Sequence, residues 1–170
     1  MDTIAGVPLH PLIVHVPVVF IPLTLVCAVV AVAWRARRGD LSVVTAGLAF
    51  VAMLGAQLAT MSGEPLEERV PRSSLIGRHA ALGETARNLA ILAFAASLAF
   101  AIREWRDRLP LPADDRVRRA VAGRVPAVAV SVALLAACGA STVFVVRAGH
   151  LGAEAAWQEA GARDVTAPGR

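Results

Sequence analysis

Four long runs without charged residues dominate the hydrophobicity pattern of the chain. They cover residues 11–34, 41–62, 88–102 and 125–146. A helix needs roughly 20 apolar residues to cross the hydrocarbon core of a bilayer, and three of the runs have that length. The third run reaches it if its helix extends upstream through residue 82. Because the runs lack the alternation of barrel strands, the pattern predicts helices, the other structure that satisfies its own backbone in lipid.

The pattern therefore predicts an all-α, four-helix transmembrane bundle that forms one domain over residues 1–170. The spans are expected at about residues 10–34, 41–62, 80–103 and 125–148, followed by an extracytoplasmic tail over residues 151–170. The composition agrees, because 56% hydrophobic residues and a mean hydropathy of +0.61 are too apolar for an ordinary soluble domain.

Several residues predict where helices end or bend. Gly63 followed by Pro65 is expected to end the second span, and Ser73 is a candidate cap for the third. Pro17 and Pro22 lie inside the first span, where each removes a backbone hydrogen bond and is expected to kink the helix.

Stripes of small residues in two spans predict close helix contacts, because small side chains let helices in lipid approach one another. The stripes consist of Gly47, Gly55, Ala59 and Gly63 in the second span and Ala129, Ala133, Ala136 and Ala140 in the fourth. No internal repeat is visible in the sequence.

The distribution of arginine predicts the orientation of the chain. All 17 basic residues are arginine. They cluster in the loops at residues 35–40 and 103–124, whereas the second loop balances its arginines with glutamates. Cytoplasmic loops are rich in basic residues, so these two loops are expected inside and both termini outside, in a multi-pass protein of the cell membrane. The net charge of +4 is thus interpreted as an orientation signal, and no nucleic-acid partner is expected.

Four histidines are the main candidates for functional chemistry: His10, His15, His79 and His150. Counted from the predicted inner edge at about 1.5 Å per residue, all four reach the outer edge of a hydrocarbon core roughly 30 Å thick. Three helices therefore bring imidazoles to one layer, as a metal ion or a haem iron requires. The alternative is that each histidine is simply hydrated at the membrane interface.

His15 is the preferred ligand, because it lies deepest and has apolar residues on both sides. His10 and His15 are about 140° apart around a regular helix, so they face one ion only if Pro11 breaks the helix. Glu64 and Glu84 are expected at the same level, either as partners of a ligand imidazole or as solvated charges.

The segment LHPLIVHVP at residues 9–17 resembles the opening signature of a bacterial family of four-helix membrane proteins, catalogued as a domain of unknown function. The resemblance continues through Gly63, His79 and the GHLGA segment that begins at residue 149. It covers nearly the whole chain, and it implies four spans and an outer face that carries histidines. Members of this family occur alongside Rieske-type or cytochrome-like redox proteins, which favours haem.

Three functions remain open. The first is a b-type haem redox module in which His15 pairs with His79 or His150, with His10 as a further candidate ligand. The second is a copper or zinc site formed by His15, His79 and His150. The third is a non-catalytic scaffold or anchor bundle. We expect an electron-transfer or structural subunit and not a stand-alone enzyme, with the lipid bilayer, a redox protein and further copies of the chain as partners.

Overall fold

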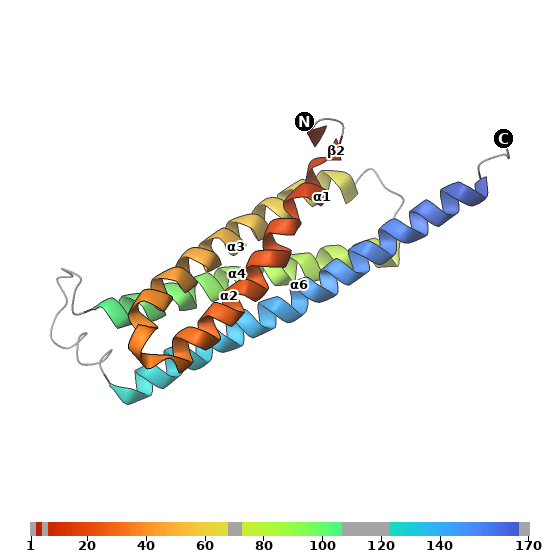
Figure 1. Cartoon of the computed structure of the whole chain (residues 1–170). Coiled ribbons are helices and arrows are strands. Elements are labelled where there is room, and N and C mark those ends of the chain that lie inside the picture. Colours follow the sequence, from red (N-terminus) through yellow and green to blue (C-terminus); the bar gives the residue numbers. More distant parts are fainter. Residues whose placement is uncertain (1–2, 5–6, 68–72, 107–122, 167–170) are drawn as a thin grey trace.

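The computed structural model describes residues 3–4, 7–67, 73–106 and 123–166 and consists of long helices packed side by side (Figure 1). The elements are β1 (Thr3–Ile4), β2 (Val7–Pro8), α1 (Leu9–Ile13), α2 (His15–Ala33), the 3-10 turn η1 (Arg35–Arg37), α3 (Arg38–Glu67), α4 (Ser74–Trp105) and α6 (Arg124–Thr166). β1 and β2 form a two-residue antiparallel ladder before the first helix. Residues 107–122 of the predicted inner loop and residues 167–170 of the predicted tail lie outside the described residues.

Among the residues that the structure describes, four helical segments are long and apolar enough to cross a membrane. They are Leu9–Ala33, Arg35–Glu67, Ser74–Trp105 and Arg124–Gln158. The all-α, four-span prediction is therefore confirmed.

The predicted helix ends are partly right. Ser73 caps α4, where its Oγ accepts a hydrogen bond of 3.2 Å from the backbone N–H of Ile76. In contrast, α3 continues through Gly63 and Pro65 to Glu67, so the predicted stop is wrong. Pro65 removes only its own N–H from the last turn, and Gly63 serves as a packing position described below.

The first span is broken near its beginning. α1 ends at Ile13, Val14 forms a turn, and α2 begins at His15. Pro17 has no N–H to donate to the carbonyl of Ile13, which explains why the helix is interrupted one turn before it. Pro22 lies inside α2 without ending the helix.

The bundle consists of two equivalent hairpins, α1–α2 with α3 and α4 with α6. Adding 69 to a buried position of α2 gives a buried position of α4. Adding 89 to a buried position of α3 gives one of α6 except at Ser42 and Gly55, whose counterparts Ser131 and Phe144 are half-buried. The pairs are Pro17/Ala86, Ile21/Ala90, Thr24/Ala93, Ala28/Ser97, Ala31/Phe100, Thr45/Leu134, Ala49/Cys138, Ala52/Ser141, Ala56/Val145 and Ala59/Ala148. Because α2 and α4 run in the same direction, a pseudo-two-fold axis runs along the bundle, as in parallel membrane repeats (Figure 1).

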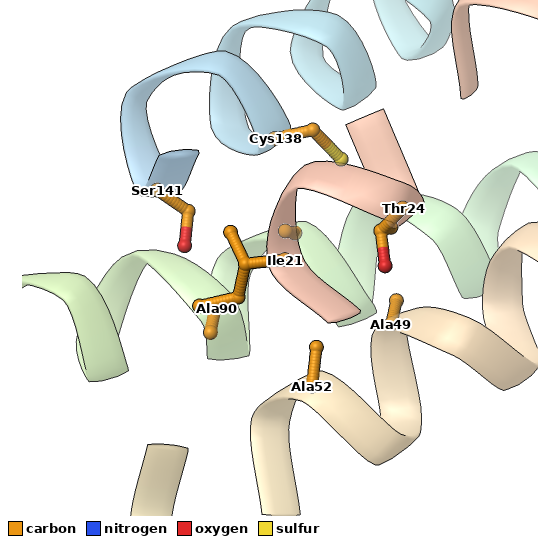
Figure 2. A pocket seen from close by; sticks show the side chains of 8 residues that line it. Ile21, Thr24, Ala49, Ala52, Ala90, Cys138 and Ser141 are labelled. Atoms are coloured by element: carbon orange, nitrogen blue, oxygen red, sulfur yellow. The ribbon is translucent and has the colours of Figure 1, made fainter. Parts of the chain in front are cut away.

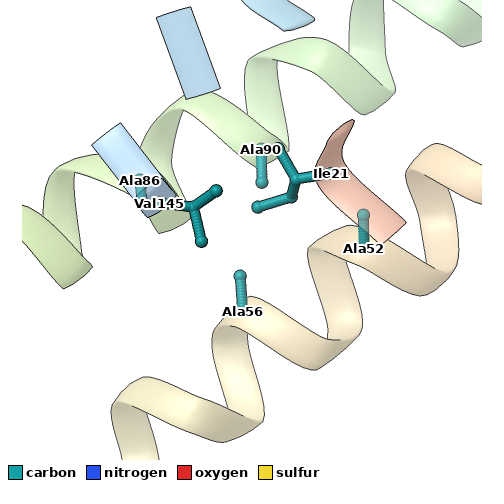
Figure 3. Close-up of a cluster of buried hydrophobic side chains, with 6 residues drawn as sticks. All are labelled: Ile21, Ala52, Ala56, Ala86, Ala90 and Val145. Carbon is teal, nitrogen blue, oxygen red and sulfur yellow. The ribbon is translucent and has the colours of Figure 1, made fainter. Parts of the chain in front are cut away.

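Small side chains from both hairpins fill the space around this axis. One apolar cluster contains Ile21, Ala52, Ala56, Ala86, Ala90 and Val145 (Figure 3). Beside it is a void of about 10 Å³ whose lining consists of four equivalent pairs: Ile21/Ala90, Thr24/Ala93, Ala49/Cys138 and Ala52/Ser141 (Figure 2). The void is at the lower limit for holding a single water molecule. The middle of the bundle is therefore closed.

The stripe of small residues in α3 is a contact surface over most of its length. A Cβ at Gly55 would lie 2.5 Å from Cγ1 of Val16, so α2 and α3 touch there through the glycine. Ala59 is also buried, but nothing lies within 4 Å of a Cβ at Gly47, which faces outward. The predicted stripe in α6 is wrong, because Ala129, Ala133 and Ala136 are exposed and Ala140 is half-buried. The buried residues of α6 are instead the members of the pairs given above: Leu134, Cys138, Ser141, Val145 and Ala148.

Replacing Gly55 by leucine should destabilise the bundle. The new side chain would overlap Val16, and overpacking of this kind costs typically 1–3 kcal/mol. We expect a clear fall in the thermal unfolding temperature in detergent for Gly55→Leu and little change for Gly47→Leu. Equal behaviour of the two variants would contradict the packing described here.

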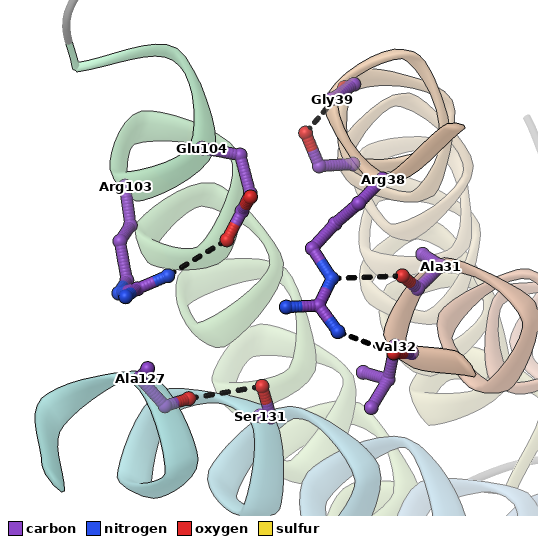
Figure 4. A network of polar contacts seen from close by, with 9 residues as sticks. Ala31, Val32, Arg38, Gly39, Arg103, Glu104, Ala127 and Ser131 are labelled. Carbon is purple, nitrogen blue, oxygen red and sulfur yellow. Dashed lines mark hydrogen bonds and ion pairs between the residues drawn. The ribbon is translucent and has the colours of Figure 1, made fainter. Parts of the chain in front are cut away.

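The end of the bundle opposite the histidines, here called the arginine end, is held by polar contacts (Figure 4). The Nε of Arg38 donates to the carbonyl of Ala31 at 3.3 Å and its Nη2 to that of Val32, which caps the last carbonyls of α2. Nη1 of Arg103 pairs with Oε1 of Glu104 at 2.8 Å. The opposite end, which carries His10 and His79, is called the histidine end.

The predicted orientation places the histidine end outside the cell, and labelling of intact cells can test it. A cysteine at Gln158, exposed on α6 beyond the histidine end, should react with a membrane-impermeant thiol reagent. A cysteine at Arg37, exposed at the arginine end, should react only after the cells are permeabilised. The reverse pattern would invert the predicted topology.

Candidate histidine site

Two of the four histidines meet inside the histidine end of the bundle. The ring centroids of His10 on α1 and His79 on α4 are 6.2 Å apart, and the ring planes are nearly perpendicular at 85°. The two residues are equivalent in the repeat, since 79 is 69 more than 10. Each hairpin therefore contributes one imidazole to a shared site on the pseudo-two-fold axis.

His10 is fixed against α3 by a hydrogen bond and a close packing contact. Its Nδ1 lies 2.9 Å from the carbonyl oxygen of Ala59 and 3.3 Å from Oγ of Ser62. The ring lies directly over Gly63, where a Cβ would come within 3.1 Å of Cε1. Gly63 thus leaves room for the imidazole and does not end the helix.

His79 is fixed against α6 in the same way. Its Nδ1 lies 2.8 Å from the carbonyl oxygen of Ala148, and a Cβ at Gly152 would come within 2.9 Å of its Cε1. Ala148 and Gly152 are the counterparts of Ala59 and Gly63, 89 residues later. The same arrangement, here called the histidine device, therefore occurs in both hairpins. In each, a histidine bonds to an alanine carbonyl and packs on the glycine four residues after that alanine.

These hydrogen bonds determine the tautomer of both rings. A carbonyl oxygen can only accept, so Nδ1 of His10 and of His79 must each donate a hydrogen. In the neutral ring, Nε2 then carries a free lone pair. Metal-ligating histidines almost always donate their other N–H to a carbonyl, a carboxylate or water in this manner. Both imidazoles thus have the hydrogen-bonding pattern of ligands.

The two histidines line a cavity of about 500 Å³ between the hairpins. This volume lies within the range of about 300–1,000 Å³ that is usual for small-molecule and cofactor sites. Most of the wall is apolar and small, and it follows the repeat. On α3 and α6 it consists of the pairs Ala56/Val145, Ala59/Ala148, Thr60/Gly149, Gly63/Gly152, Glu64/Ala153, Leu66/Ala155 and Glu67/Ala156.

The structure does not bring His15 or His150 to this pair. His15 is exposed on the outer surface of α2, where its Nδ1 donates to the carbonyl of Pro11 at 2.7 Å. That bond satisfies the donor locally, so the depth of His15 in an apolar run does not require a ligand. His150 is exposed on α6 and does not line the cavity.

Of the two alternatives for the acidic residues, the structure agrees with the solvated charges and not with partners of the imidazoles. Glu64 and Glu84 line the cavity but are exposed, and the imidazoles are oriented by backbone carbonyls instead. Within the described part of the chain, no three histidine, cysteine or carboxylate side chains come together as a metal site. The site therefore offers two ligands on opposite walls.

Comparison with known proteins places this geometry in a family. The family model described as a predicted membrane protein, DUF2231, matches residues 6–164. The chain belongs to the DUF2231 family. No curated protein and no solved structure matches it. The resemblance drawn from the sequence is thus confirmed as far as a membrane protein family of unknown function, and the DUF2231 match assigns no cofactor.

Sequence reasoning missed the pairing of His10 with His79. A signal for it is present, because the pattern A-x-x-x-G occurs at residues 59–63 and again at residues 148–152. Each copy provides the carbonyl and the glycine for one histidine. This short repeat could have indicated which histidines are held in place.

Proposed function

We propose that this DUF2231 protein is a membrane electron-transfer module that holds one b-type haem between His10 and His79. The observation that carries the proposal is the fixed pair of imidazoles at 6.2 Å on the wall of a large cavity. Haem bound in this way would supply reversible one-electron transfer near one surface of the membrane.

The distance between the rings supports a shared metal. When two imidazoles bind one metal from opposite sides, each metal–nitrogen bond is about 2 Å long and each nitrogen lies about 1 Å from its ring centre. The two ring centres are then roughly 6 Å apart. The centroids of His10 and His79 are 6.2 Å apart. His10 and His79 would hold the iron of a haem placed between them, and the haem would supply one-electron redox chemistry.

The cavity supports a large group over a bare ion. A single metal ion with two ligands needs little space, whereas this cavity has a volume of about 500 Å³. Its walls next to the histidines carry glycine and alanine at Ala59, Gly63, Ala148 and Gly152, so they are apolar and have no bulky side chains. A lining of this kind suits a large apolar group better than a hydrated ion.

The proposal changes the ligand set predicted from the sequence. His10 and His79 replace His15 with His79 or His150 as the axial pair. The copper or zinc site of three histidines has no counterpart among the described residues, so we do not propose it. The scaffold function is the alternative outcome of the experiment below, and a redox protein partner and a homo-oligomer stay predictions.

Titration of the purified protein with hemin in lipid nanodiscs tests the proposal. We expect saturation at one haem per chain with the absorption spectrum of a six-coordinate, low-spin iron. The double variant His10→Ala/His79→Ala should show only the weak, non-saturating binding of hemin to lipid. Identical titrations of the two proteins would reject the haem site and leave the scaffold function.

A further inference from the structure

The cavity between the hairpins has two mouths. Within each hairpin the seam between the helices is filled by a histidine ring, His10 against Gly63 and His79 against Gly152. The remaining seams, between α3 and α4 and between α1–α2 and α6, run between the hairpins. Each of these seams contributes exposed residues to the cavity wall, and these two rims are what is meant here by the two mouths.

The two mouths are equivalent in the repeat but opposite in chemistry. The α3/α4 mouth carries Thr60, Glu64, Glu67 and Glu84, and all three glutamates are exposed. The α2/α6 mouth carries Pro11, Val18, Gly149, Ala153 and Ala156, none of which is charged.

The contrast holds along α3 and α6, where Thr60 corresponds to Gly149, Glu64 to Ala153 and Glu67 to Ala156, each 89 residues apart. Glu84 on α4 corresponds to His15 on α2, 69 residues earlier, which is exposed but does not line the cavity. The histidine device and most of the buried core positions are repeated in both hairpins, so the difference at the mouths is not a general loss of the repeat. Because carboxylates surround one of the two equivalent openings and not the other, we expect the two openings to have different functions.

Carboxylates and apolar groups have opposite requirements at the surface of a membrane. An ionised carboxylate needs water or a polar partner, and its desolvation is costly. Three of them around one mouth therefore keep that mouth hydrated. Glycine, alanine, valine and proline around the other mouth offer nothing to hold water, and acyl chains can cover them.

We propose that the α3/α4 mouth is the aqueous entrance to the histidine pair and that the α2/α6 mouth is closed by lipid. Positively charged, water-soluble reactants reach the cavity by the first route, because three negative charges raise their local concentration. The assignment of this mouth as the entrance depends only on the residues that line the cavity and not on haem binding. Only the identity of the natural reactant, a cationic one-electron donor or acceptor, rests on the proposed function.

Two cysteine variants at equivalent positions test the two mouths directly. Thr60→Cys is nearly isosteric, and Gly149→Cys is accommodated because nothing lies within 4 Å of a Cβ at Gly149. Both variants are labelled in lipid nanodiscs with a cationic methanethiosulfonate, which reacts only in water. The unmodified chain, whose Cys27 is half-buried and Cys138 buried, gives the background rate.

We expect Thr60→Cys to react at least ten times faster than Gly149→Cys. A small lipid-soluble maleimide should react with both, which shows that the Gly149→Cys thiol is present and reactive. Equal rates with the cationic reagent, or a faster rate for Gly149→Cys, would overturn the assignment of the mouths.

Reagents of opposite charge test the role of the glutamates. At Thr60→Cys the ratio of the cationic rate to the sulfonate rate should be severalfold higher than the ratio for a small free thiol, and high salt should reduce it. Replacing Glu64, Glu67 and Glu84 together by glutamine should bring the ratio close to that of the free thiol. An unchanged ratio would overturn the electrostatic part of the proposal. All rates are measured without haem, so a protein that binds no haem can still pass this test, and a haem protein can still fail it.

Discussion

Replacing His79 by alanine is expected to convert the hemin-loaded protein from a six-coordinate, low-spin form into a weakly bound five-coordinate, high-spin form. His10→Ala should have the same effect, because the two residues are equivalent in the repeat and are held by equivalent bonds. The loss of affinity should exceed the roughly 10–100-fold that removal of an outer-shell partner costs at metal sites. Absorption spectra and hemin titrations of the purified variants measure both effects.

The other two histidines provide matched controls for this prediction. His15→Ala and His150→Ala remove exposed imidazoles from the same end of the bundle and should leave the spectrum unchanged. All four variants should insert equally well, since insertion depends on the apolarity of the spans and not on one histidine. Loss of haem in His15→Ala with retention in His10→Ala would contradict the site and restore the ligand predicted from the sequence.

Replacing Gly152 by alanine is expected to weaken hemin binding while every ligand remains in place. The new Cβ would lie 2.9 Å from Cε1 and 3.1 Å from Nδ1 of His79, so the ring must move away from its hydrogen bond with the carbonyl of Ala148. Displacing an orienting contact of this kind typically costs 10–100-fold in affinity. Gly63→Ala should act in the same direction on His10, but less strongly because the corresponding distance is 3.1 Å.

Gly139→Ala separates this effect from the general consequences of replacing a helical glycine. Nothing lies within 4 Å of a Cβ at Gly139 on the same helix. Alanine favours a helix by up to about 1 kcal/mol over glycine, so Gly139→Ala should gain thermal stability and bind hemin normally. If Gly152→Ala also bound hemin normally, the glycine would not define the position of His79.

The fold could be predicted from the sequence because the apolar runs alone require it. Four segments of sufficient length without charges leave few other structures in a bilayer, and each predicted span lies within one long apolar helical segment or within a residue of its ends. The helices extend beyond the spans, and α6 continues to Thr166 through most of the predicted tail. The helix ends were harder to predict. Pro65 and Gly63 are typical of a helix end, but both lie within α3, because the glycine is needed to accommodate His10.

The site could be predicted only in part, since depth along a helix says nothing about direction around it. Counting residues brought all four histidines to one level, but His15 is exposed and its ring bonds to the carbonyl of Pro11, four residues earlier. The break at Val14 follows from Pro17, where a kink was predicted, and it lies between His10 and His15, which were compared on a regular helix. Which histidines meet depends on how the helices pack.

The repeat could not be detected in the sequence because equivalent positions share their burial and packing more often than their residue type. Ile21 corresponds to Ala90 and Ala49 to Cys138, so equivalent core positions differ in size and chemistry. The histidine and its alanine–glycine partner are identical in both hairpins, which is where the geometry permits least variation.

The visible spectrum of the native protein, before and after reduction with dithionite, tests the central claim most directly. The protein is purified gently from membranes of cells supplied with a haem precursor, and its helical content is checked on the same sample. The account predicts a Soret band and, after reduction, the sharp α and β bands of a six-coordinate b-type haem, at one haem per chain. A folded protein that stays colourless, and that takes up no hemin afterwards, would contradict it.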